Sequence, residues 1–275
     1  MQNMTVKKID TFLTGKELWD AEGSLNDDAY RKYFNSKRLF YERFGDYMKR
    51  EIIALRDITK SEMISFIKEH KKAVFKPDDK YAGIGFFIAS CDENGDVIFL
   101  DDAPSFEEMQ DGNYIMEEYV YQHKAYSDMY DLSLNTVRVT TFITANGVPE
   151  ILFVVNQFGS EGSYVDNDDI TSIWNVTDPE TGIIIGCEED ENNGFLYEIH
   201  PDSRKPFIGF KNPYFEEIKN TALKAAMEIP QCRLIGWDIA VREDGEIVII
   251  EGNVTPELWM YQRLSHDGLK RITAI

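Results

Sequence analysis

The sequence predicts an α+β fold with mainly antiparallel sheets, and three observations indicate it. Between residues 26 and 56, aromatic and aliphatic side chains recur at helical spacing. From residue 73 onward, short apolar stretches alternate with turn residues, as strands do. Two pairs of these stretches meet at Asn146-Gly147 and at Asp244-Gly245, and such dipeptides favour tight antiparallel hairpins. The pattern lacks the regular alternation of strands and helices that a doubly wound parallel sheet needs.

The individual elements follow in chain order. After the helix-rich stretch, a short helix is expected at 61–67, with a cap at Thr59 or Ser61. Pro213 suits the first position of an amphipathic helix that runs to about Met227. Another short helix is expected near 105–110, and strands at 73–76, 83–88, 97–100 and 114–120, in the two halves of 134–155, and at 234–241 and 247–250. The polar, glycine-rich stretch 156–212 is typical of loops with short strands.

Composition limits the function classes. With 275 residues, 43% of them hydrophobic, the chain can form one large domain or two lobes that share a cleft. The net charge of −20 repels nucleic acid and anionic lipid, so neither is an expected partner. Three scattered cysteines argue against a disulfide framework or structural zinc. No apolar run is long enough to cross a membrane and no signal segment is evident, so we expect a cytoplasmic protein.

The hairpin near the C-terminus carries the clearest chemical signal. If Asp244 and Gly245 form a two-residue loop, counting outward places Asp238 directly opposite Glu251, with Cβ atoms roughly 5 Å apart. Asn253 lies two residues beyond Glu251 and projects to the same face. A three-residue loop would shift the pairing and remove this opposition.

Two opposed carboxylates repel each other, and a divalent cation would remove that penalty. Oxygen ligands in small number suit magnesium, which keeps waters and substrate phosphates in its coordination shell. Asp238, Glu251 and Asn253 are therefore the predicted metal ligands. The alternative is a pair of solvated acids on an exposed hairpin face.

A lysine and two glycines form a second candidate feature. Lys76 ends a strand, and Gly83 and Gly85 begin the next one, so positive charge and accessible backbone N–H groups could hold phosphates. The alternative is an ordinary hairpin with one exposed lysine. The chain has no P-loop, no dinucleotide-binding glycine motif, no protein-kinase motifs and no convincing protein nucleophile.

Taken in order, these pieces resemble the ATP-grasp superfamily. More closely, the chain resembles the sugar-transfer-associated ATP-grasp group found with polysaccharide biosynthesis genes. The resemblance rests on the ordered set above and on two stretches, Ser-Leu-Asn-Thr-Val-Arg-Val-Thr at 133–140 and Ile-Gly-Trp-Asp-Ile-Ala at 235–240. It spans roughly residues 35–256.

The resemblance implies two α+β lobes that sandwich ATP. A helical N-terminal segment would cover residues 1–70. The small lobe, with a glycine flap and a hinge, would cover 71–122, and the large lobe with the magnesium site 123–275.

The resemblance also implies residue roles. Lys76 and Lys37 would contact the phosphates under a flap containing Gly83 and Gly85. Asp238, Glu251 and Asn253 would bind two magnesium ions. Arg138 would face the reacting acyl phosphate, with Asn135 as a second catalytic residue, although Arg138 could instead pair with a surface acid. The hinge would consist of Glu117, Glu118, Tyr119 and Val120; the backbone of the last two would read adenine, unless both are simply core residues.

The implied function is an ATP-dependent carboxylate–amine ligase that works through an acyl phosphate. Its partners would be a small-molecule or sugar-linked carboxylate and an amine, in surface polysaccharide synthesis. Two departures from the family pattern are evident: Asn156 stands near an expected arginine, and Asp166-Asn167 is followed by Thr171-Ser172 in place of Gly-Gly. They keep open a catalytically reduced Mg-ATP-binding scaffold or regulator, and a phosphotransferase remains a third possibility.

Overall fold

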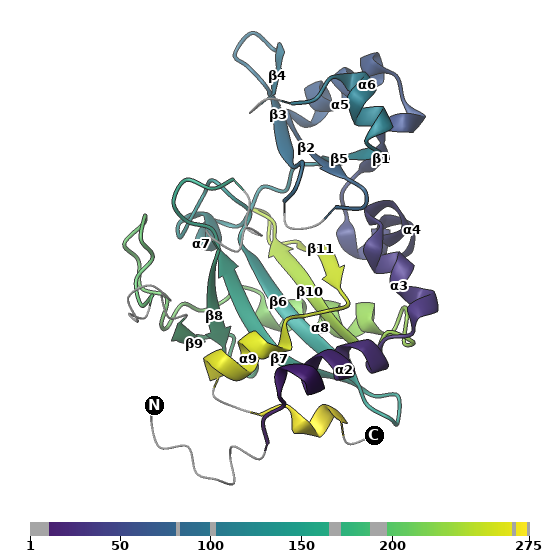
Figure 1. Cartoon of the computed structure of the whole chain (residues 1–275). Coiled ribbons are helices and arrows are strands. Elements are labelled where there is room, and N and C mark those ends of the chain that lie inside the picture. Colours follow the sequence, from purple (N-terminus) through teal and green to yellow (C-terminus); the bar gives the residue numbers. More distant parts are fainter. Residues whose placement is uncertain are drawn as a thin grey trace.

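Two antiparallel sheets form the framework of the chain (Figure 1). The computed structural model describes residues 11–80, 83–99, 103–164, 172–187, 197–265 and 268–273. Within them, the smaller sheet has the strand order β1-β5-β2-β3-β4 and the larger sheet the order β11-β10-β6-β7-β8-β9. The α+β class with antiparallel sheets is confirmed.

The smaller sheet and its helices form the upper lobe in Figure 1. Its apolar face packs on helices α5 and α6 through buried side chains such as Phe66, Phe75 and Met109. The elements of this lobe are β1 (Ile52–Ala54), η1 (Leu55–Asp57), α5 (Lys60–His70), β2 (Lys72–Pro77), β3 (Phe87–Cys91), β4 (Val97–Phe99), α6 (Phe106–Asp111) and β5 (Tyr114–Glu118).

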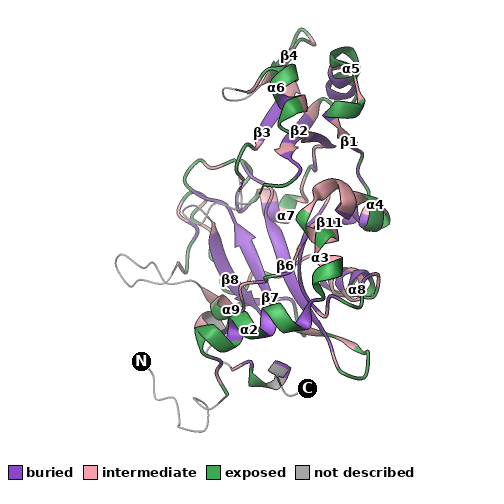
Figure 2. Ribbon diagram, turned by 45° about the vertical axis from the view of Figure 1, so that its right-hand side comes forward, coloured by how far each residue is buried: buried purple, intermediate pink, exposed green. Residues whose placement is uncertain are grey.

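The larger sheet is buried on both faces along its central strands, as the purple ribbons of Figure 2 show. Helix α8 packs against one face, and α2 and α9 lie against the other. The elements are α2 (Gly15–Leu25), α7 (Lys124–Ser127), β6 (Thr136–Ile143), β7 (Pro149–Phe158), β8 (Ile173–Thr177), β9 (Ile184–Cys187), α8 (Phe215–Ala226), β10 (Leu234–Val241), β11 (Ile247–Asn253), α9 (Leu258–Ser265) and η2 (Lys270–Thr273).

Helices α3 (Asp28–Asn35) and α4 (Lys37–Met48) occupy the junction of the two lobes. The apolar stripe of α4 packs on the large sheet: the rings of Phe40 and Phe44 lie 4.6 Å apart, and Phe44 meets Trp237 edge-on at 5.3 Å. The N-terminus of α4 is bound instead to the small lobe, where the Asp78 carboxylate accepts a hydrogen bond from the Arg38 N–H at 2.7 Å. The helix therefore contacts both lobes.

Replacing Phe44 with alanine should lower the free energy of unfolding by about 3–5 kcal/mol, because this fully buried ring fills the space between α4 and Trp237. Denaturant unfolding measures the change. Glu42→Ala on the same helix is the control, and it should stay within about 0.5 kcal/mol of the unaltered protein because its side chain is exposed. Equal midpoints for the two variants would contradict the assigned packing.

Several local predictions are confirmed and others need correction. Thr59 caps α5 through a capping box with Glu62. The Gly83–Ile88 stretch is mostly a turn, since strand β3 begins only at Phe87. Helix α8 begins after Tyr214, so Pro213 lies just outside it. The start of helix α2 was not located and strand β1 was not expected; the division of the chain at residues 70 and 122 stays a prediction.

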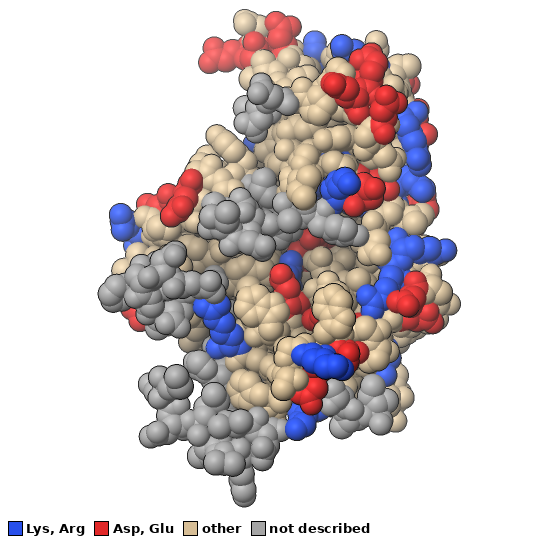
Figure 3. All heavy atoms as spheres, viewed as in Figure 1, with Lys and Arg blue, Asp and Glu red and all other residues tan. Residues whose placement is uncertain are grey.

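The charges of the surface are mixed. Figure 3 shows Lys and Arg scattered among Asp and Glu on the face in view, without a continuous basic stripe. The net charge of the whole chain is −20. Among the described residues, no helix is long and apolar enough to cross a membrane.

Candidate functional site

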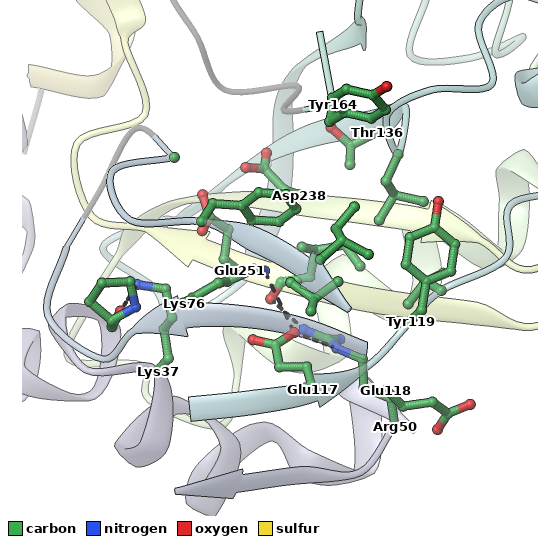
Figure 4. A pocket seen from close by; sticks show the side chains of 18 of the residues that line it. Lys37, Arg50, Lys76, Glu117, Glu118, Tyr119, Thr136, Tyr164, Asp238 and Glu251 are labelled. Carbon is green, nitrogen blue, oxygen red and sulfur yellow. Dashed lines mark hydrogen bonds and ion pairs between the residues drawn. The ribbon is translucent and has the colours of Figure 1, made fainter. Parts of the chain in front are cut away.

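A cavity lies between the two lobes, and both contribute its walls (Figure 4). The small lobe provides charged side chains at one end and apolar ones at the other, and the large lobe faces them with β10 and β11. The lining residues are Lys37, Arg50, Val74, Lys76, Pro77, Lys80, Gly83, Ile84, Phe86, Ile88, Glu117, Glu118, Tyr119, Val120, Leu132, Leu134, Thr136, Tyr164, Asp238, Ile250 and Glu251. The cavity thus combines an apolar pocket with a charged end.

The β10–β11 hairpin does place Asp238 opposite Glu251, but not for the predicted reason. Its loop has three residues, because Arg242 pairs with Glu246 and Gly245 adopts φ +88°. The expected two-residue loop is wrong. A β-bulge then inserts Ile250 as an extra residue in β11, which shifts the pairing back by one position. The bulge therefore restores the opposition of the two carboxylates.

Arg138 holds Asp238 from the neighbouring strand. The two residues are directly paired across β6 and β10, and the guanidinium donates to both carboxylate oxygens at 2.6 and 2.8 Å. A third bond reaches Glu257 at 2.7 Å, and the ring of Trp174 covers the guanidinium at 4.7 Å. The neighbouring acids raise the pKa of the buried Arg138 against the effect of burial. Arg138 is thus a fixed positive charge beside the carboxylate face.

The carboxylate face is buried and electrostatically coupled. Burial raises the pKa of Asp238 to about 6; Arg138 opposes the rise and Glu251 adds to it. Burial alone would also raise the pKa of Glu251, but the attraction of Lys76 and Arg138 leaves it lowered. The Asn253 amide donates to Asp238 at 3.1 Å and to Glu251 at 3.3 Å. All three side chains therefore converge on one point.

This donor set fits magnesium. Three oxygen-bearing side chains meet, and the amide nitrogen of Asn253 now bridges the carboxylates where a cation would reduce their repulsion. No cluster of three His, Cys, Asp or Glu side chains suited to a metal occurs among the described residues. A bound ion would consequently need further oxygen ligands, such as nucleotide phosphates and water.

Lys76 and Lys37 supply positive charge at the same end of the cavity. The ammonium of Lys76 lies 3.5 Å from the Glu117 carboxylate. Lys37 donates to the backbone carbonyls of Pro77 at 2.9 Å and of Lys80 at 2.6 Å, so it holds the loop after β2. Burial and the nearby Lys76 lower its pKa. The structure thus brings both predicted lysines to the carboxylate face.

The protein-family comparison agrees with this geometry. The family model described as sugar-transfer associated ATP-grasp matches residues 52–274. The chain belongs to this ATP-grasp family. A search of the curated proteins found no match.

Solved structures show the same fold. A complex of the ATP-grasp ligase PsnB with its minimal precursor is 12% identical, with a TM-score of 0.51, and the match covers 89% of this chain and 60% of that one. A PsnB complex with a phosphomimetic precursor, Mg and ADP matches with a TM-score of 0.50 at 12% identity, over 90% and 58%. D-alanyl-alanine synthetase A from Vibrio cholerae O1 biovar eltor str. N16961 is 14% identical, with a TM-score of 0.47, over 88% and 62%. The ATP-grasp chain thus spans about three fifths of the length of these ligases.

The residues of the predicted hinge in this ATP-grasp chain differ in their surroundings. Glu118 accepts a hydrogen bond from Arg242 at 2.8 Å, which joins β5 to the large lobe. Tyr119 lies under the ammonium of Lys72, 3.7 Å from its ring centre. Val120 is buried against the large sheet, although it also lines the cavity. The roles of their backbone groups toward adenine stay predictions.

The two flap glycines both adopt positive φ, +68° for Gly83 and +74° for Gly85. A Cβ on Gly85 would lie 2.7 Å from the Tyr114 hydroxyl and 2.8 Å from Pro77, so a side chain there would push the turn away from β2. Gly83 lines the cavity itself. The chain conformation here is therefore one that glycine permits.

Asn135 and Asn156 do not reach the cavity. The Asn135 amide donates to the carbonyls of Tyr126 and Tyr130, and its oxygen accepts from the Gly159 N–H, so it is engaged in fixing loops. Asn156 pairs opposite Val137 on the core side of the sheet and exchanges two hydrogen bonds with Asn212. An arginine at position 156 would point away from the cavity. Residues 165–171, including Asp166, Asn167 and Thr171, lie outside the described residues.

Two further residues were missed by sequence reasoning. Arg50 is buried between the lobes, and nothing in Lys49-Arg50-Glu51 distinguishes it from a surface charge. Glu257 has φ +56°, unusual for a residue with a side chain, and bonds to Arg138. Only the contacts of these side chains reveal them.

Magnesium affinity should fall as the pH drops through about 6, because protonation of Asp238 competes with the cation. The stability of the metal-free fold should change with pH in the opposite direction. The folded pKa of Asp238 is raised from 3.8, so the folded state binds more protons than the unfolded chain between pH 3.8 and 6, and its stability falls as the pH rises. Calorimetric titration with magnesium and ATP between pH 5 and 8 measures the affinity. An affinity that does not change with pH would contradict the assignment.

Proposed function

We propose that this chain binds Mg-ATP in the cavity between its lobes. The observation that carries the proposal is that one cavity joins an apolar pocket, two lysines and the converging carboxylate face. The apolar part, between Val74, Val120 and Leu134, suits a base. The phosphates would then extend toward Lys76 and Lys37.

In this arrangement Asp238, Glu251 and Asn253 would hold one or two magnesium ions. When bound, magnesium supplies positive charge that neutralises the phosphate oxygens. Lys76 is held beside these ligands by its ion pair with Glu117, which fixes where its charge acts. Glu117 keeps its own charge, because Lys76 and Arg50 lower its pKa against the effect of burial.

We further propose that the chain is an ATP-dependent carboxylate–amine ligase. A substrate carboxylate oxygen would attack the γ-phosphorus, with ADP leaving, to give an acyl phosphate. The amine nitrogen would then attack the acyl carbon, expel phosphate and lose a proton to give the amide. Neither step needs a protein nucleophile, and no Cys, Ser or His lines the described cavity. Arg138 does not itself line the cavity; its fixed charge, held behind Asp238, would help to position the anionic intermediate.

We propose a place in surface polysaccharide synthesis in the cytoplasm, with a sugar-linked or small carboxylate as substrate; the family description, sugar-transfer associated, points only toward a sugar. A Mg-ATP-binding scaffold is the second candidate. The missing arginine does not decide for it, because Asn156 exchanges hydrogen bonds with Asn212 and does not line the cavity. The phosphotransferase would differ in leaving a stable phosphorylated product.

The test is ADP release from ATP and magnesium in the presence of candidate uronic or amino acids, with and without amines. A ligase requires both substrates for full turnover, and hydroxylamine should trap the acyl phosphate as a hydroxamate. A stable phosphorylated product would identify the phosphotransferase. Tight Mg-ATP binding without turnover on any carboxylate would favour the scaffold.

A further inference from the structure

Arg50 joins the two lobes at the wall of the cavity. It follows Lys49, which adopts the left-handed conformation at the end of α4, and precedes strand β1 of the small sheet. Its side chain is 1% exposed, which is rare for an arginine unless its donors are bonded. Figure 4 shows it beside Glu117, at the side of the cavity away from Tyr164.

The guanidinium bonds to both lobes, and a longer bond of 3.5 Å returns to the Met48 carbonyl of α4. Its Nε donates to the Glu117 carboxylate of β5 at 3.0 Å. Its Nη1 donates to the Ile249 carbonyl at 2.7 Å and its Nη2 to the Ile250 carbonyl at 3.0 Å, both on β11. The planar guanidinium of Arg50 therefore links the small sheet to the backbone of the large sheet.

The two carbonyls belong to the bulge that positions the metal ligand. Ile250 is the extra residue of the bulge, and Glu251 follows it directly. Strand β11 is the edge strand of its sheet, so carbonyls on its outer side need donors from elsewhere. Arg50 supplies donors to two successive carbonyls at the bulge, which favours the bulged pairing over the regular one. The regular pairing would turn Glu251 to the other face.

Through Glu117, the Arg50 guanidinium also affects Lys76, the lysine proposed to bind phosphate. Glu117 is 5% exposed in its side chain and bonds to both Arg50 and Lys76. Without Arg50, this buried carboxylate would have Lys76 as its main partner and would draw the ammonium toward itself. The guanidinium thus shares the negative charge and leaves Lys76 near the face of Glu251.

We propose that Arg50 is a positioning residue that couples the metal ligand Glu251 to the phosphate lysine Lys76, so that magnesium and ATP bind cooperatively. This inference rests on the proposed function, since it assigns Arg50 to the Mg-ATP site. Arg50 touches neither ligand in this role. It acts through the bulge at Ile250 and through Glu117.

Arginine is needed here because its planar fork reaches an acid and two carbonyls at once, whereas a lysine ammonium would keep the charge but lose this geometry. Arg50→Lys therefore retains the charge beside Glu117 while giving up the paired carbonyl bonds. Arg50→Met removes both. A matched control exists in Arg242, which also links the lobes through a hinge acid, Glu118, but does not contact the bulge.

The experiment measures ATP and adenosine affinities by calorimetry, each with and without magnesium, on the full chain. In the unaltered protein, magnesium should raise ATP affinity and leave adenosine affinity unchanged. In Arg50→Lys this magnesium-dependent gain should fall by about ten-fold, within the usual range of coupling between sites, while adenosine affinity holds. Arg242→Lys should keep the full gain. A variant that only disturbed the structure of the cavity would weaken the binding of adenosine as well.

The outcomes separate the inference from the function beneath it. If the ATP affinity of the unaltered protein does not depend on magnesium, the proposed function fails and this inference fails with it. If the unaltered protein responds and Arg50→Lys responds equally, only the inference is overturned. Should Arg50→Met fail to fold, Arg50→Lys alone decides. The inference is also overturned if Arg242→Lys reduces the magnesium-dependent gain in ATP affinity as much as Arg50→Lys does. Any bond between the lobes would then be enough to couple magnesium and ATP.

Discussion

Glu251→Gln should lower magnesium-dependent ADP release by about 100- to 1000-fold, as expected when a charge-stabilising group is removed from a preorganised site. Glutamine keeps the shape of the side chain and one oxygen, but it cannot supply the negative charge that opposes Asp238 across the hairpin. The cation would then have a single carboxylate ligand. Initial rates at saturating ATP, over a range of magnesium concentrations, measure the effect.

The same substitution should change the free energy of unfolding by no more than about 1 kcal/mol. Loss of attraction to Lys76 and Arg138 is offset by relief of repulsion from Asp238, since all of these groups act on Glu251 or its neighbour. Glu246→Gln is the matched control on the same hairpin, because its carboxylate is half-exposed and pairs with Lys49. Equal activity of the two variants would remove Glu251 from the site.

Arg138→Met should destabilise the fold by about 3–5 kcal/mol, because it leaves the buried Asp238 carboxylate without its partner. Arg138→Lys should cost less, since a charge remains, yet ammonium cannot replace the two parallel bonds to Asp238 or the third to Glu257. Both variants should lose at least about 100-fold in turnover if Arg138 positions the anionic intermediate.

Denaturant unfolding and ADP release, measured on the same samples, distinguish these effects. Arg233→Lys is the control: Arg233 precedes β10 and donates to the Ile143 carbonyl at 2.8 Å, and although neither arginine lines the cavity, Arg138 bonds to the lining residue Asp238. Full turnover in Arg138→Lys, with a stable fold, would contradict a role in the reaction and leave Arg138 as a partner of Asp238 only.

Much of the fold could be predicted because its signals are local. The Thr59 cap bonds to Glu62 three residues on, and the strand pair around Gly147 is set by a turn of a few residues. Helix α2 falls within the helical segment expected over residues 1–70, but its start was not located, although Thr14 and Glu17 form the same kind of capping box. The glycine flap was misread as a strand, since glycine permits the positive φ that a turn requires.

The candidate site was predicted less completely. Lys76, Lys37, Asp238, Glu251 and Asn253 do converge, because each lies at a strand end, a helix start or a facing position of a hairpin. The roles assigned to them stay proposals. Asn135, predicted as catalytic, bonds to the backbone of loops outside the cavity, and nothing in the linear sequence shows which way such an amide faces.

The carboxylate hairpin shows what each level of structure decided. By itself, the sequence determined that Asp238 and Glu251 lie on adjacent antiparallel strands, because alternating apolar residues flank an Asp-Gly turn. The tertiary structure decided that they face each other. The loop alone would have set them one residue out of line, and the bulge at Ile250 corrects this. Its carbonyls are bonded by Arg50, about 200 residues earlier in the chain, and a contact at that separation depends on how the lobes pack.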